Sequence, residues 1–320
     1  MKILVTPASF KPSMESPALE QLRLFAGELV FNPHNQPLEE AELISLLKGC
    51  DGCIAGLDPF NRKVIESAKT LKVISRYGAG VDNVDLAAAG ERGITVCNTP
   101  GVNAEAVADL AFGLMLSLAR KLPLLDRNTR EGKWDRSIGT ELYRKTIGIL
   151  GLGAVGRAVA RRAAGFSMRV LACDPALDIA YAQAHRITPV DLNRLVSESD
   201  IVSLHLPLKA DTRHIISIDV MCNMKKGALL INTARGGLID ETAACALLRS
   251  GHLGGMGLDV YESEPPCDPA LFSLDNVALT PHTAARTVEA TALMARVSVQ
   301  NLIDVLSGKD CPYTVAAWTE

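Results

Sequence analysis

The chain has 320 residues, of which 48% are apolar and 22% charged, and its formal net charge is −3. This length is typical of two domains rather than one. The weak net charge and the lack of a basic tract argue against nucleic acid or an anionic membrane as a partner, and no apolar run reaches the roughly 20 residues that cross a bilayer.

The first hundred residues alternate short strand patterns with longer helical patterns. The strand-like runs are ILVT (3–6), CIAG (53–56), KVISRY (72–77) and ITVCN (94–98). Helical patterns between them cover 37–50 and 84–93. This alternation predicts an α/β unit of the flavodoxin-like type with a parallel sheet.

The cysteines and the N-terminus indicate a reducing compartment. Eight cysteines are spread along the chain without the spacing of a disulfide framework, and most lie in apolar runs. We interpret them as small buried residues. Cys50 and Cys53 form a C-x-x-C pair, but no second pair completes a metal site, so we predict no metal. The opening segment is too short for a signal peptide, and we expect a cytoplasmic protein.

A long helical pattern at 103–120 interrupts the alternation. Val107, Leu110, Leu114 and Leu118 recur at helical spacing on a broad apolar face. We expect this helix to connect two units or to pack against a partner subunit.

A second α/β series begins at Thr146. Its strand-like runs are TIGILG, RVLACD, IVSLHL, ALLINT, GGMGLDV and NVALTP, with helical patterns near 155–165, 191–197, 217–224 and 240–250. A last helical pattern covers 283–307. Its apolar periodicity would allow this helix to return and pack on the first unit.

The segment ILGLGAVGRAVA contains Gly151, Gly153 and Gly156 in G-x-G-x-x-G order, between an apolar strand and a helix. These glycines permit a tight turn, a close approach of the backbone to a pyrophosphate, and close packing of helix on strand. The phosphates would meet the free N–H groups at the start of the helix. Asp174 ends the next strand, where its carboxylate would bind the ribose hydroxyls and repel a 2′-phosphate. The pattern therefore predicts NAD as the cofactor.

Polar residues follow three strands of the second series, where open α/β sheets place their ligands. Arg235 follows ALLINT, Asp259 and Glu264 lie in GLDVYESEPP, and His282 follows NVALTP. A histidine can exchange a proton near neutral pH, and an arginine offers a planar fork to a carboxylate. Singly, each would be an ordinary surface or turn residue. Together, and combined with the dinucleotide-binding motif, they predict hydride transfer at C2 of a 2-hydroxy/2-oxo acid.

The sequence resembles the D-isomer-specific 2-hydroxyacid dehydrogenase family, and within it the phosphoglycerate dehydrogenase branch. The resemblance extends from about Val73 to Gly308 and rests on RYGAGVDNVD, NTPGVNAEAVADL, GKWDR, GTEL, TIGILGLGAVGRAVA, HLPL, NTARGGLID, GLDVYESEPP and TPHTAA. It implies two Rossmann-like or flavodoxin-like domains: an NAD-binding domain at 101–285, inserted into a substrate domain made of 1–100 and 286–320. It also implies a homodimer formed through the helix and arm at 103–140.

The resemblance assigns roles to individual residues. Arg235 would bind substrate, His282 would act as acid and base, and Glu264 would orient it. The backbone of Tyr77, Gly78, Ala79 and Gly80 would bind the substrate carboxylate. The implied cofactor contacts are Gly151, Gly153, Val155, Gly156, Asp174, His205, Pro207, Thr212, Thr233, Ala234, Asp259 and Ala284.

Two features depart from the family pattern. Thr283-Ala284-Ala285 follows His282 where many relatives carry glycine, so a methyl group near the nicotinamide would shift its pose modestly. The sequence printed here ends at Glu320 without the family's C-terminal regulatory domain, so we expect no feedback control through such a domain.

Arg76 bears on the choice of substrate. In the phosphoglycerate branch an arginine here faces a distal phosphate, which implies 3-phosphoglycerate or another acid with a second anionic group. If Arg76 is instead an exposed strand-end residue, a hydroxypyruvate/glyoxylate reductase or a general 2-oxo acid reductase becomes the alternative. Lys11 and Arg136 could also reach substrate, although a solvated surface position is the simpler interpretation of both.

A further alternative belongs to another class of protein. Corepressors of the same fold bind NAD(H) as a switch for recruiting partners. The absence of Pro/Ser-rich tails from this sequence argues against that alternative.

Overall fold

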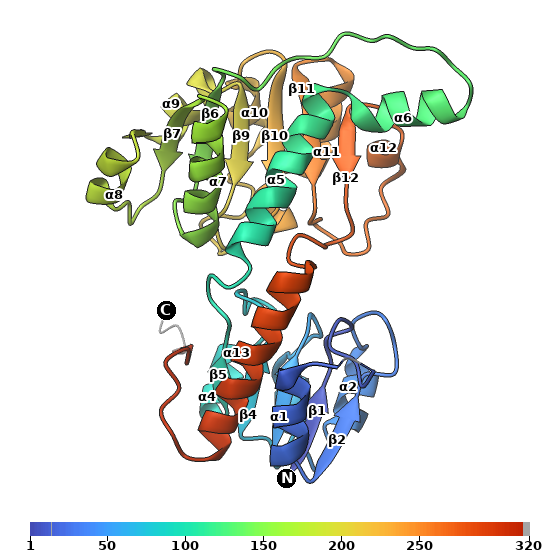
Figure 1. Cartoon of the computed structure of the whole chain (residues 1–320), viewed down its shortest axis with the longest axis vertical. Coiled ribbons are helices and arrows are strands. Elements are labelled where there is room, and N and C mark those ends of the chain that lie inside the picture. The colour runs from blue at the N-terminus through green and yellow to red at the C-terminus, as the bar shows by residue number, and fades with distance from the viewer. Residues whose placement is uncertain (14, 316–320) are drawn as a thin grey trace. The chain divides into compact units, whose positions relative to one another are not determined.

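The computed structural model describes residues 1–13 and 15–315. The chain divides into two compact units: unit 1 contains Met1–Asn103 and the segment from Arg286 onward, and unit 2 contains Ala104–Ala285. Each unit is a parallel sheet with helices on both faces (Figure 1), which confirms the predicted fold class.

Unit 1 has a five-stranded sheet in the order β2-β1-β3-β4-β5. The strands are β1 (Lys2–Val5), β2 (Glu28–Phe31), β3 (Gly52–Ala55), β4 (Val73–Arg76) and β5 (Thr95–Cys97). Helices α1 (Pro17–Phe25) and α13 (Val288–Leu306) pack side by side on one face. The other face carries the core formed with α2 (Glu40–Leu46), α3 (Arg62–Ser67) and α4 (Leu86–Glu91).

Local chemistry explains these elements. β3 and β4 are buried along their whole length, as expected of central parallel strands. Ser16 caps α1 by accepting the N–H of Leu19, with Pro17 as the first helical residue. Asn61 and Asp85 cap α3 and α4 in the same way.

Unit 2 has a seven-stranded sheet in the order β12-β11-β10-β9-β6-β7-β8. The strands are β6 (Thr146–Leu150), β7 (Arg169–Cys173), β8 (Ile187–Pro189), β9 (Ile201–Leu204), β10 (Ala228–Asn232), β11 (Leu253–Leu258) and β12 (Val277–Leu279). The strand order reverses between β6 and β9. Ligands of open α/β sheets bind beside the carboxyl ends of the strands at such a reversal.

The two faces of the unit 2 sheet form separate cores. One core joins the sheet to α5 (Ala104–Ala119), α7 (Ala154–Gly165) and α8 (Ile179–Ala184). The other core joins it to α9 (Leu192–Glu198), α10 (Ile218–Cys222) and α11 (Glu241–Arg249). Shorter elements are α6 (Leu122–Arg130), the 3-10 turn η1 (Gly236–Leu238) and α12 (Pro269–Phe272). α5 crosses the sheet beside α7 and packs on β10 and β11 (Figure 1).

Two strands and one helix boundary illustrate where the structure differs from the prediction. β2 and β8 were not expected from the sequence; both are edge strands, of four and three residues, which is too short to show a clear period. The last helix begins at Val288, not at 283, because Thr287 caps it and the preceding residues form a loop. None of the helices within 1–13 and 15–315 has both the length and the apolar character to cross a membrane.

Candidate active site

The glycine-rich loop joins β6 to α7 in unit 2. Gly151 has φ 96°, and a Cβ there would lie 2.5 Å from the carbonyl oxygen of His205. A Cβ on Gly156 would lie 2.1 Å from the carbonyl oxygen of Gly151, so neither position accepts a side chain. Gly153, by contrast, has no atom within 4 Å of an added Cβ. The loop is therefore tight against the protein and open at Gly153, as a backbone that receives a pyrophosphate requires.

Asp174 lies directly after β7 and reaches this loop. Its Oδ2 accepts the N–H of Leu152 at 2.7 Å, and its Oδ1 accepts the N–H of Ala176 at 2.8 Å. The residue is half-buried. A carboxylate oxygen accepts more than one hydrogen bond, so both oxygens retain capacity for ribose hydroxyls. The charge in this position disfavours a 2′-phosphate.

Two polar atoms at neighbouring strand ends are buried without a partner in the described part of the chain. They are Nδ1 of His205, after β9, and Oγ1 of Thr233, after β10. The His205 Nε2 lies 2.9 Å from the hydroxyl of Ser203, and burial lowers the pKa of the imidazole to about 3, so the ring is neutral. Buried polar atoms normally have partners. Unsatisfied atoms at these strand ends therefore fit a site that takes a polar dinucleotide.

His282 and Glu264 form a direct pair in unit 2. The His282 Nδ1 lies 2.7 Å from the Glu264 Oε2, while Oε1 of Glu264 accepts the N–H of Tyr261 at 3.2 Å. No hydrogen bond to the His282 Nε2 is formed by any described residue. Because Nδ1 donates to the carboxylate, Nε2 is the nitrogen left to exchange a proton with a ligand.

The loop that carries His282 is held by Asp259. The Asp259 side chain is fully buried; it accepts hydrogen bonds from the hydroxyl of Thr280 at 2.7 Å and from the N–H groups of Thr283 and Ala284, each at 2.8 Å. His282 itself has φ 49°, a left-handed conformation that few non-glycine residues adopt. The observed role of Asp259 is thus to fix a strained turn, and its predicted contact with the cofactor stays a prediction.

Arg235 follows β10 on a loop shaped by Asn232, which sequence reasoning missed. The buried Asn232 side chain donates to the Arg235 carbonyl at 2.7 Å and accepts the N–H of Ala234 at 3.0 Å. A Cβ on Gly236 would lie 1.9 Å from the carbonyl carbon of Tyr261, so this loop packs directly against the one that leads to Glu264. The sequence did contain a signal for Asn232, because it is a polar residue that ends an apolar strand directly before a turn.

Tyr261 is a second residue that the sequence prediction missed. Its hydroxyl donates to the carbonyl of Thr280 at 2.9 Å, which links the Glu264 loop to the His282 loop. Burial raises the pKa of Tyr261 to about 12, so the phenol keeps its proton. The carboxylate of Glu241 supports the same loop by accepting the N–H of Glu262 at 2.8 Å.

The other predicted cofactor residues lie at the same edge of the unit 2 sheet. Val155 is in the first turn of α7, Ala234 follows β10, and Ala284 lies in the loop after β12. In the loop after β9, the hydroxyl of Thr212 donates to the carbonyl of Pro207 at 2.9 Å. The structure therefore groups these residues at the carboxyl ends of adjacent strands.

Unit 1 contains the predicted carboxylate loop, Tyr77–Gly80, directly after β4. Arg76 is only 4% exposed, which excludes the alternative of an exposed strand-end arginine. Its Nη1 donates to the carbonyls of Tyr77 at 2.8 Å and Ala55 at 3.3 Å, and its Nε donates to Asn83 at 3.2 Å. A Cβ on Gly78 would lie 3.2 Å from the Arg76 Nη1. Arg76 thus packs beneath the loop and supports it, and its contact with substrate stays a prediction.

Two further contacts fix this loop within unit 1. The hydroxyl of Tyr77 donates to the carbonyl of Thr291 on α13 at 2.8 Å. The carbonyl of Ala79 accepts from the side-chain amide of Asn98 at 2.7 Å. No group of three or more metal-binding side chains occurs in the described residues.

Known proteins are similar to this chain in sequence and in fold. The sequence profile described as "D-isomer specific 2-hydroxyacid dehydrogenase, NAD binding domain" matches residues 112–284. A glyoxylate reductase from Korarchaeum cryptofilum is 40% identical over 287 residues, which are 87% of this chain and 86% of the relative. A D-3-phosphoglycerate dehydrogenase from Methanocaldococcus jannaschii is 42% identical over 276 residues, 85% of this chain but only 53% of the relative. A crystal structure of a Thermus thermophilus protein superposes with a TM-score of 0.89 at 38% identity, covering 99% of this chain and all of that one.

Proposed function

Because the chain belongs to the D-isomer-specific 2-hydroxyacid dehydrogenase family and its residues 112–284 match the NAD-binding domain of that family, we propose that Arg235, Glu264 and His282 perform the reaction at C2 of its substrate. The observation that carries this proposal is the Glu264–His282 pair at 2.7 Å, which leaves the imidazole Nε2 without a partner in the described chain. The neighbouring Arg235 loop, in contact with Tyr261, supplies the cation that an anionic substrate needs.

Each residue has a distinct task in the reduction of a 2-oxo acid. Arg235 binds the carboxylate and polarises the C2 oxygen through its guanidinium fork. His282 donates a proton from Nε2 to that oxygen, and Glu264 stabilises the imidazolium and keeps the ring oriented. The hydride to C2 would come from NADH bound at the glycine loop. The products are the 2-hydroxy acid and NAD⁺, and in oxidation His282 accepts the proton instead.

The preferred substrate is 3-phosphoglycerate, or another acid with a second anionic group, with 3-phosphohydroxypyruvate as its oxidised form. Similarity to the phosphoglycerate dehydrogenase branch supports this choice. Relatives with either name are about equally similar to this chain: the glyoxylate reductase is 40% identical and the phosphoglycerate dehydrogenase 42%. Reduction of hydroxypyruvate or glyoxylate is therefore the alternative within the same class.

A panel of 2-oxo acids tests the substrate class. NADH oxidation is measured with 3-phosphohydroxypyruvate, hydroxypyruvate and glyoxylate under identical conditions. We expect the highest kcat/KM with the phosphorylated acid. A higher value with hydroxypyruvate or glyoxylate would reject the phosphorylated substrate in favour of the alternative. Binding of NADH without turnover of any acid would favour the corepressor-like function.

Asp174 provides a separate test of the cofactor assignment. Asp174→Ala is expected to weaken NAD⁺ binding about 10–100-fold, because charge-assisted hydrogen bonds to the ribose are lost. Discrimination against NADP⁺ should fall at the same time, since the repelling charge is gone. Fluorescence titration with both cofactors measures this. Asp174→Asn keeps the size of the side chain and part of its hydrogen bonding. It should therefore relax the discrimination against NADP⁺ with a smaller loss of NAD⁺ affinity. An unchanged preference for NAD⁺ over NADP⁺ in both variants would contradict the assignment.

We also propose that the enzyme is a homodimer formed through 103–140. Large apolar side chains on this segment are exposed, among them Trp134 at 86%, Ile138 at 89% and Leu122 at 50%. Exposed apolar surface of this kind is typical of a protein–protein interface. Sedimentation of the parent protein and of a Trp134→Ser/Ile138→Ser double variant tests this: the parent should be a dimer, and the variant should dissociate more readily.

A further inference from the structure

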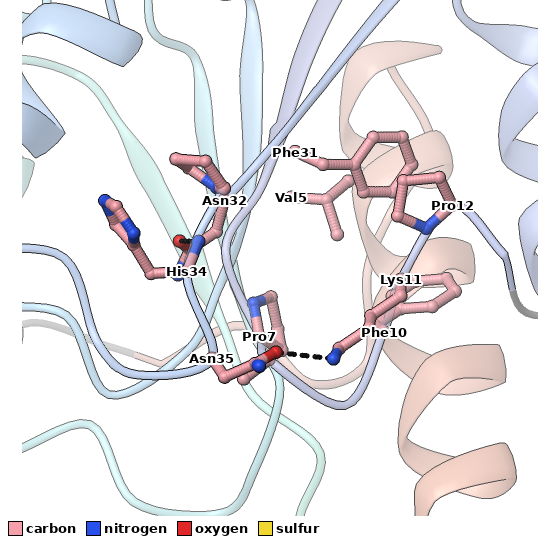
Figure 2. Close-up of a pocket in the computed structure, with 11 residues that line it drawn as sticks. Val5, Pro7, Phe10, Lys11, Pro12, Phe31, Asn32, His34 and Asn35 are labelled. Atoms are coloured by element: carbon pink, nitrogen blue, oxygen red, sulfur yellow. Dashed lines mark hydrogen bonds between the residues drawn. The ribbon is translucent and has the colours of Figure 1, made fainter.

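Unit 1 contains a pocket of about 210 Å³ at the carboxyl ends of β1 and β2 (Figure 2). Val5, Phe10 and Phe31 form apolar walls together with three prolines, and Lys11, Asn32 and Asn35 form the polar side. The lining residues include no carboxylate. Complete small-molecule sites usually enclose about 300–1,000 Å³. This volume therefore suits one functional group of a ligand rather than a whole cofactor.

Lys11 is the positive charge of this pocket. Its Nζ donates to the side-chain oxygen of Asn35 at 2.5 Å (Figure 2), and no carboxylate of the described residues pairs with it. His34 also borders the pocket, but its Nε2 contacts the carboxylate of Glu42 at 2.8 Å, which compensates any charge on the ring. Asn32 is engaged with the backbone carbonyls of Thr6 and Gln36.

The side chains of Lys11 and Asn35 therefore both have N–H groups that remain for a ligand. The Lys11 ammonium has three N–H groups, of which one contacts Asn35, and the Asn35 amide nitrogen forms no hydrogen bond with the described residues. Both lie beside aromatic and proline side chains, which accommodate a short carbon chain (Figure 2). This combination is complementary to a phosphate or carboxylate at the end of a short tail.

The pocket adjoins the predicted carboxylate loop within unit 1. The ring of Phe10 stacks on the ring of Tyr77 with centroids 6.1 Å apart, so one wall of the pocket touches the first residue of that loop. The pocket and the loop are thus connected through this aromatic contact. Arg76, which sequence reasoning favoured for the distal anionic group of the substrate, packs against the same loop, where its Nη1 donates to the carbonyl of Tyr77.

We propose that the Lys11 pocket binds the distal anionic group of the substrate, through the Lys11 ammonium and the Asn35 amide. This inference rests on the proposed function, because it assumes that the substrate carboxylate binds at Tyr77–Gly80. It makes Lys11 a specificity-determining residue that takes no part in the chemistry at C2.

Kinetics with a matched pair of substrates test the proposal. Lys11→Gln is expected to raise KM for 3-phosphohydroxypyruvate about 10-fold, with kcat nearly unchanged, because a charge-assisted contact to the tail is lost. Glyoxylate has no tail, so its kinetics should not change. Lys11→Arg should retain most of the affinity, and Lys69→Gln, an exposed lysine of the same unit, serves as the control. Equal losses with both substrates, or no loss with either, would overturn the proposal.

A binding experiment separates this proposal from the proposed activity. Calorimetry compares 3-phosphoglycerate with glycerate, each titrated into the parent and Lys11→Gln proteins in the presence of NAD⁺. The ratio of the affinities for 3-phosphoglycerate and glycerate should be about 10-fold lower in the variant, even if no acid on the panel is turned over. Inorganic phosphate is titrated in parallel. The variant could lose affinity for inorganic phosphate while the ratio of the affinities for 3-phosphoglycerate and glycerate stays unchanged. In that case the pocket binds a separate anion, and the assignment to the substrate tail is wrong.

Discussion

Replacing His282 with alanine is expected to lower kcat by about 10²–10⁴-fold, the range typical of lost general acid–base catalysis. The Nε2 of His282 is the one titratable nitrogen in the Glu264 pair that makes no hydrogen bond among the described residues. Without it, the C2 oxygen has no positioned proton donor. NADH affinity should stay near that of the parent protein, because the glycine loop and Asp174 are unchanged.

Steady-state kinetics and NADH fluorescence titration measure the two effects separately. Glu264→Gln keeps the hydrogen bond to Nδ1 but removes the charge, so we expect a smaller loss and an altered pH profile of kcat/KM. His252→Ala is the matched control, since His252 contacts the carbonyl of Met221 at 3.0 Å away from the pair. Parental kcat in the His282→Ala variant would remove this residue from the mechanism.

The glycine loop shows what sequence reasoning predicts well. A Cβ at Gly156 would lie 2.1 Å from the carbonyl oxygen of Gly151. At Gly156 the requirement for glycine is imposed by backbone only a few residues away, so spacing alone reveals it. The meeting of Glu264 and His282 has another cause that a sequence also reveals: each follows a parallel strand of one sheet, and the carboxyl ends of β11 and β12 are neighbours.

Arg76 and Asp259 show where such reasoning stops. The acceptors that engage Arg76 include the carbonyl of Ala55 on β3, and the donors that engage Asp259 lie beyond β12. Those contacts depend on how distant segments meet, which no local pattern contains. A charged residue at a strand end has the same sequence signature whether it faces a ligand or holds a loop. The structure adds that both side chains hold loops, and their contacts with ligands stay predictions.

The neighbouring loops of unit 2 depend on one another. Gly236 packs against Tyr261, Tyr261 donates to the carbonyl of Thr280, and Asp259 holds the turn that follows. Arg235, Glu264 and His282 therefore stand on three loops that contact or hydrogen-bond to each other. Each loop limits the movement of the next, which is how a site keeps its geometry before substrate binds.

Replacing Arg235 with glutamine is expected to lower kcat/KM by about 10²–10³-fold, comparable to the loss of one preorganised electrostatic donor in other active sites. The fork of Arg235 is the group that we assign to the substrate carboxylate and the C2 oxygen, so the variant should lose both affinity and rate. Arg235→Lys keeps the charge but loses the bidentate geometry. We expect it to recover part of the binding and little of the rate.

Kinetics with glyoxylate and the affinity of oxamate, an unreactive analogue of a 2-oxo acid, measure the two losses. Glyoxylate is the appropriate substrate because it has no tail, so the Lys11 pocket does not contribute. Arg249→Gln is the control, since Arg249 is exposed and donates to the carbonyl of Ala270 on α12. If Arg235→Gln retains both oxamate affinity and kcat/KM, the anion is held elsewhere and the assignment of Arg235 is wrong. If oxamate affinity falls but kcat does not, Arg235 binds the carboxylate without polarising the C2 oxygen, and His282 alone carries the chemistry at that atom.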